Sequence, residues 1–117
     1  MVEQMEDFEI QHIDRNITEY KAHIELGKAF SRLASNRDFK KLVLDGYFKD
    51  EAIRLVHLLS HPSFDTDSKR APVITQMDSI GCFSQFLRTI EHNAVLAEKS
   101  LVEAEELREA LLAGEEM

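Results

Sequence analysis

The sequence predicts an all-α fold: a helical hairpin or small bundle with a long, coiled-coil-like C-terminal helix. Apolar or small residues recur in the last third with alternating steps of three and four, the spacing of a helix face that packs against another helix. The chain has 4 Gly, 2 Pro and no Trp, too few turn residues for a β-sandwich or a loop-rich binding fold. With 117 residues and 44% hydrophobic content, residues 1–117 are expected to form a single domain. The recurring positions are Ile80, Phe83, Leu87, Ile90, Ala94, Ala97, Leu101 and Ala104.

Residues 1–14 are predicted to be an acidic arm, either a docking arm or a loose tail that orders only on contact. They hold five acids and no Lys or Arg, unlike the basic start of a secretory signal. The first helix is expected over 15–34, with Asp14 or Asn16 as its cap. Gly27 lies on its apolar face and costs about 1 kcal/mol in helix propensity, so we expect another helix backbone to come close there.

A second helical stretch is predicted from Ser35 or Asn36 to Ser60, which completes the two helices of residues 15–60. Ser35 and Asn36 are cap-type residues, and Asp38 adds negative charge to the first turn. The pattern is interrupted at Asp45-Gly46, where we expect a kink or tight turn because Gly can adopt the left-handed conformation that ends a helix. Core positions are expected at Phe39, Phe48, Leu55 and Phe83.

Residues 61–74 contain both prolines and are predicted to be an exposed loop. The long helix is expected over 75–112, opened by Thr75 and Asp78 as a capping box. At about 1.5 Å per residue it would be roughly 55 Å long, more than the shorter helices cover. The uncovered part is therefore expected to contact a partner chain. The predicted protein-interaction residues are Ile90, Ala94, Ala97, Leu101, Ala104 and Leu111.

No convincing catalytic or metal site is visible in the sequence. His57 and His61 are four apart and share a helix face, but no Cys or carboxylate lies beside them to complete a zinc site. We interpret His61 as a cation at a helix C-terminus and the lone Cys82 as a small buried packing residue. We expect no enzymatic activity, no cofactor and no small-molecule substrate.

Residues 36–48 read NRDFKKLVLDGYF and are followed by Glu51-Ala52 and Arg54-Leu55. This run resembles a segment of small helical proteins of tailed bacteriophages, and the charged C-terminal helix adds to the likeness. The resemblance implies a phage-encoded virion component or assembly factor, located in the virion or the host cytoplasm. It brings no catalytic motif.

The first functional hypothesis is a non-enzymatic structural or assembly protein that packs on itself or on other phage structural proteins. The alternative is a small acidic protein that inhibits a host enzyme or defence system by occupying a basic groove. Its basis is the charge of the last third: residues 73–117 carry −6 of the total −8, which also disfavours nucleic-acid binding. An adaptor with a coiled-coil dimer is a third possibility. No stretch has the roughly 18 apolar residues that span a membrane.

Overall fold

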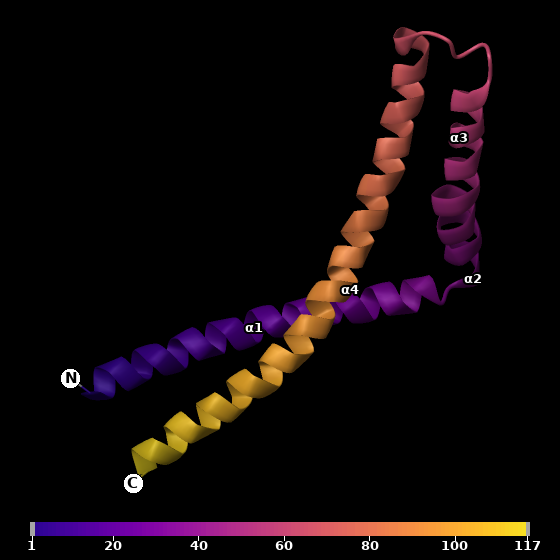
Figure 1. Cartoon of the computed structure of the whole chain (residues 1–117). Helices are drawn as coiled ribbons and strands as arrows, with labels where there is room; N and C mark the ends of the chain where they lie inside the picture. The colour runs from indigo at the N-terminus through magenta and orange to yellow at the C-terminus, as the bar shows by residue number, and fades with distance from the viewer. Residues whose placement is uncertain (1, 117) are drawn as a thin grey trace. The chain divides into compact units, whose positions relative to one another are not determined.

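The computed structural model describes residues 2–116, with the side chains of 2–4, 6, 115 and 116 outside that description. The predicted all-α class with a long C-terminal helix is confirmed, since no strand occurs within residues 2–116 (Figure 1). The elements are α1 (Val2–Ala34), α2 (Arg37–Phe39), η1 (Lys40–Glu51), α3 (Ala52–Ser60) and α4 (Asp67–Glu116).

The chain divides into two compact units. Unit 1 comprises Met1–Ala29 and Ile90–Met117, and unit 2 comprises Phe30–Thr89. Helix α4 contributes its first part to unit 2 and its last part to unit 1.

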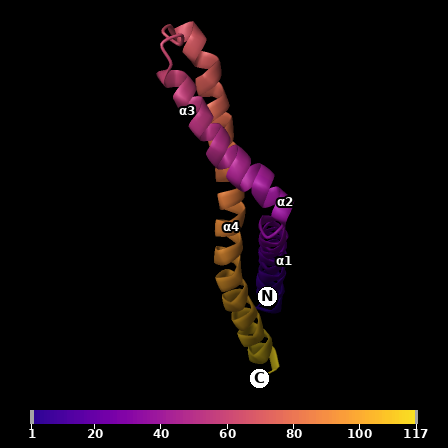
Figure 2. The ribbon, with the colours of Figure 1, turned by 90° about the vertical axis from the view of Figure 1, so that its right-hand side faces the viewer.

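Unit 1 is an antiparallel pair of helical segments, α1 up to Ala29 and α4 from Ile90 onward. The N-terminal part of α1 and the C-terminal end of α4 lie at the same end of this pair (Figures 1 and 2). The pairing register follows from two contacts: Gly27 faces Ala94, and Asp14 binds Arg108. The buried side chains of the pair are Ile13, Ala94 and Ala97.

Helix α1 begins at Val2, so the prediction of an acidic arm over residues 1–14 is wrong. Between Val2 and Gly27 no Gly or Pro interrupts the helix, and Ile13 extends its apolar face toward the N-terminus. The contact that we expected to order this segment is supplied by α4 of the same chain. Asp14 therefore lies inside the helix and is not its cap.

The cap of the second helical stretch is confirmed, because the Asn36 side chain accepts a hydrogen bond from the Phe39 N–H at 2.9 Å. The prediction of a kink or tight turn at Asp45-Gly46 is wrong. Gly46 has no positive φ and lies inside η1, a π-helix. A Cβ on Gly46 would stand 2.9 Å from the Lys41 carbonyl oxygen, so the absent side chain accommodates the close approach of residue i−5.

Unit 2 has its core where α3 packs on the first part of α4. Leu55 is 1% exposed and is buried with Val73 and Ile80. Phe48 packs against this cluster, and its ring centroid lies 5.3 Å from that of Phe83. Of the predicted core residues, Leu55 is buried, and Phe39 and Phe48 are half-buried. Phe83 is 38% exposed, so its prediction as a core residue is wrong.

Helix α4 begins at Asp67 instead of Thr75, which shortens the predicted loop of 61–74 to residues 61–66. Thr66 caps the helix, since its hydroxyl accepts a hydrogen bond from the Lys69 N–H at 3.3 Å. Thr75 lies inside the helix, where its hydroxyl donates to the Ala71 carbonyl at 3.0 Å. Pro72 is also helical; it falls in the second turn, where a missing N–H leaves only one carbonyl without its helical partner.

Cys82 is exposed, so its predicted role as a buried packing residue is wrong. The buried positions of this part of α4 are Val73, Ile80 and Leu87, spaced by seven residues. Cys82 lies two positions after Ile80, which turns it about 200° around the helix, away from the core.

Candidate protein-interaction surface

The six predicted interaction residues pack inside unit 1. Ala94 and Ala97 are 8% and 3% exposed, and Ile90, Leu101, Ala104 and Leu111 are half-buried. The premise that no helix of the same chain covers this seam is wrong, because α1 starts at Val2 and contacts α4 at Ala94 and Arg108. The step pattern of three and four was interpreted correctly as a helix-packing face. Its partner helix belongs to the same polypeptide.

Small residues set the closest approach of the two helices. A Cβ on Gly27 would overlap the methyl group of Ala94, so the backbone of α1 comes close to α4 at this point. The prediction that Gly27 permits close helix approach is confirmed. Any larger residue at either position has to push the helices apart.

An ion pair fixes the register farther along unit 1. The Arg108 Nε donates to the Asp14 Oδ1 at 2.7 Å. The two side chains are 40% and 49% exposed, so solvent screens the pair and it is worth about 0.2–1 kcal/mol. Its main consequence is positional, since it aligns the apolar residues on either side of it.

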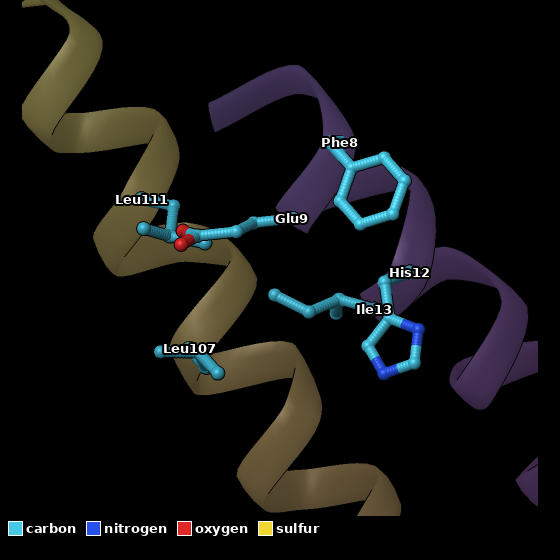
Figure 3. Close-up of a pocket in the computed structure, with 6 residues that line it drawn as sticks. All are labelled: Phe8, Glu9, His12, Ile13, Leu107 and Leu111. Atoms are coloured by element: carbon cyan, nitrogen blue, oxygen red, sulfur yellow. The ribbon is translucent and has the colours of Figure 1, made fainter. Parts of the chain in front are cut away.

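Beyond the ion pair lies a hollow of about 390 Å³ between α1 and α4. Figure 3 shows Glu9 and Ile13 of α1 directed toward Leu107 and Leu111 of α4, with Phe8 and His12 beside them. Phe8 is 65% and Leu107 53% exposed, so the walls of the hollow present apolar surface to water.

A second hollow of about 190 Å³ lies between the same two helices. His23 and Leu96 are among its lining residues; they are eleven residues from His12 and Leu107, respectively, which line the first hollow. Eleven residues complete almost three whole helical turns, so both hollows lie on one side of the helix pair. We call this side the groove face. Its residues are those lining the two hollows: Phe8, Glu9, His12, Ile13, Tyr20, His23, Asn93, Leu96, Ala97, Ser100, Leu107 and Leu111.

The opposite flank of α4 carries exposed valines. Val95 and Val102 are 66% and 54% exposed and are seven residues apart, hence on one face. Neither valine lines either of these two hollows. Leu107 and Val102 therefore form a matched pair: equally exposed apolar residues, of which only Leu107 belongs to the groove face.

Unit 1 carries almost all of the excess acid. Its two segments contain 15 Asp and Glu and 5 Lys and Arg, a net charge of −10 with neutral His, whereas unit 2 carries +2.

In unit 2 the Arg54 guanidinium donates to Glu51 at 2.6 and 2.9 Å. This hydrogen bonding lowers the pKa of Glu51 and raises that of Arg54.

Within the described part of the chain, no three His, Cys, Asp or Glu side chains gather closely enough to hold a metal ion. His61 ends α3, and its Nδ1 accepts a hydrogen bond from the Ser63 N–H at 3.1 Å. No helix in residues 2–116 combines the length and the apolar character needed to cross a bilayer.

The steps of three and four in the sequence mark the face that α4 packs on α1, and they do not identify the groove face. The signal that marks it is the eleven-residue spacing of His12 and His23 on α1 and of Leu96 and Leu107 on α4. That signal identifies a face only when both helices are known to pair.

Comparison of the chain with protein-family models, with curated proteins and with solved structures gives no match. The resemblance of residues 36–55 to tailed-phage proteins therefore stays a prediction.

Proposed function

We propose that this chain is a non-enzymatic structural or assembly protein that binds other proteins through the groove face of unit 1. Following the sequence resemblance, we place it among virion-associated bacteriophage proteins, in the virion or the host cytoplasm. It uses no cofactor in this role. The partner is itself or another structural protein of the particle.

The observation that carries the proposal is the amount of apolar surface left in water. Among the described side chains, 14 large hydrophobic ones are exposed and 7 hydrophobic ones are buried. Single exposed apolar residues are ordinary, but a contiguous patch indicates a binding surface. In unit 1 three apolar residues that line the hollows of the groove face, Phe8, Leu96 and Leu107, are each more than half exposed.

Association through the groove face differs from the predicted association through the six interaction residues of α4. A partner helix cannot pack on Ala94 while Gly27 of α1 lies against it. The groove face remains accessible with the helix pair intact. Association of a folded chain is thus expected to depend on Leu107 and Phe8, with Ala97 needed for the fold of unit 1.

A second candidate function is favoured by the charge of −10 on unit 1. A protein with this charge suits inhibition of a host enzyme or defence system by occupation of a basic groove. In that role the acidic side chains carry the affinity, and binding should fall steeply as salt rises.

The test is sedimentation of the purified chain alone and with purified phage particles, combined with light scattering. A structural or assembly protein is expected to cosediment with particles or to exceed the mass of one chain, and to lose this behaviour in Leu107→Gln but not in Val102→Gln. A strict monomer that cosediments with no particle would contradict the proposal. Binding to a basic enzyme that both variants retain would favour the inhibitor instead.

A further inference from the structure

We propose that the groove face takes one amphipathic α-helix of a partner protein, with two apolar anchors eleven residues apart and Lys or Arg beside them. The inference rests on the proposed function and names the chemistry of the partner. It follows from the spacing of the two hollows, their unequal size and the charge around them.

The spacing of the hollows selects a helix as the occupant. The hollow at Leu107 and the hollow at Leu96 are separated by eleven residues of α4, about 16 Å along the helix axis. On a helix laid alongside α4, two residues eleven apart point to the same side and are separated by the same distance. One helix therefore fills both hollows at once, in the manner of helix-in-groove recognition.

The two hollows differ in size and lining, which gives the partner helix a direction. The larger, of about 390 Å³, is walled by Phe8, Leu107 and Leu111 and suits an aromatic anchor. The smaller, of about 190 Å³, includes Asn93 and Ser100 in its lining and suits a short aliphatic anchor such as Val. The aromatic residue should therefore lie at one defined end of the partner helix.

The charge of unit 1 favours a basic partner over a second copy of the chain. Glu9 lines the larger hollow, and Glu19 and Glu103 are exposed on the two helices between the hollows. Pairing two groove faces would bring together two units of −10 each, which repel one another. Lys or Arg on the flanks of a partner helix would instead be attracted and would speed its association.

The experiment measures binding of labelled peptides to the full chain by fluorescence anisotropy. The test peptide is a Lys-rich amphipathic helix of about 20 residues with Phe and Val eleven positions apart, made in both orders. One control peptide places the same anchors nine positions apart, on opposite helix faces. A second control replaces every Lys with Glu. We expect saturable binding of the test peptide in one order, and binding at least about tenfold weaker for each control peptide.

Two variants of the chain locate the binding site. Leu107→Gln is expected to weaken binding of the test peptide by about fivefold to tenfold. Val102→Gln, a change at an equally exposed position on the other flank, should alter binding by less than about twofold. Circular dichroism of both variants checks that the helices are retained.

Equal binding of the nine-spaced peptide or of the Glu peptide would overturn the inference, as would equal loss in both variants. No saturable binding of the test peptide up to roughly 1 mM would overturn it as well. If the peptides fail but Leu107→Gln still abolishes cosedimentation with particles, the partner chemistry is wrong and the proposed function stands. If the peptides fail and the chain associates with nothing, both are wrong.

Discussion

Replacing Gly27 with Ala tests the packing of unit 1 with a single methyl group. In an open helix position, Gly→Ala gains about 0.5–1 kcal/mol because Ala has the better helix propensity. Gly81 is such a position, with nothing within 4 Å of an added Cβ. At Gly27 the same methyl would overlap that of Ala94. Neither methyl can rotate away, since each is fixed directly to its backbone.

The expected magnitude follows from these two terms. Forcing a methyl group into a packed contact costs about 1–3 kcal/mol, against the propensity gain of about 0.5–1 kcal/mol. Gly27→Ala should therefore change the free energy of unfolding by between about zero and a loss of about 2.5 kcal/mol, whereas Gly81→Ala should raise it. The difference between the two variants, about 1–3 kcal/mol, isolates the contact with Ala94.

The assay is urea unfolding followed by far-ultraviolet circular dichroism, with the double variant Gly27→Ala, Ala94→Gly as the complement. Moving the methyl group from one helix to the other restores the space. The free energy of unfolding of the double variant should therefore exceed, by about 1–3 kcal/mol, the value expected from adding the effects of the two single changes. If Gly27→Ala stabilises the chain as much as Gly81→Ala does, the close approach of α1 and α4 at this point is refuted.

Three further predictions concern burial and charge. Ala97→Glu should unfold unit 1 or destabilise it by roughly 2–4 kcal/mol, because it buries a carboxylate. Val95→Glu, at an exposed position, should leave the thermal midpoint nearly unchanged. Equal effects of the two changes on the thermal midpoint would contradict the assigned burial. Leu55→Ala should cost about 2–5 kcal/mol in chemical denaturation, since it empties the most buried position of unit 2; a loss below about 1 kcal/mol would refute that core. The pKa of Glu51, followed by carboxyl NMR, should lie below its ordinary value because the Arg54 guanidinium binds the carboxylate. The ion pair should therefore stabilise the fold above that ordinary pKa and lose its effect as pH falls through the lowered value; an unchanged pKa in Arg54→Gln would show that the hydrogen bonds are not its cause.

Local features of the fold could be predicted from neighbouring residues. The Asn36 cap depends on a side chain and an N–H three residues apart, so the sequence contains the whole interaction. The apolar period of the last third likewise indicates a packed helix face without knowledge of the partner. Gly27 on such a face indicated close approach, though not that the approaching residue is Ala94.

Helix boundaries were less predictable because composition and contact compete there. The acids of residues 1–14 predict an arm, but this segment is helical, and Ile13 and Asp14 in it lie against α4. Gly46 reads as a helix end in isolation, and the structure keeps it helical by widening the turn into a π-helix. For the acidic segment, contacts outside the local pattern outweigh the local preference.

By itself the sequence determined the all-helical class, the presence of a long C-terminal helix and the face along which that helix packs, because these depend on residues within a few turns of one another. The tertiary structure alone decided which helix covers that face. Gly27 and Ala94, or Asp14 and Arg108, are separated by most of the chain, and nothing in a local period specifies such a pairing. Once α1 occupies the seam, the surface left for a partner is the groove face, which the seam pattern could not identify.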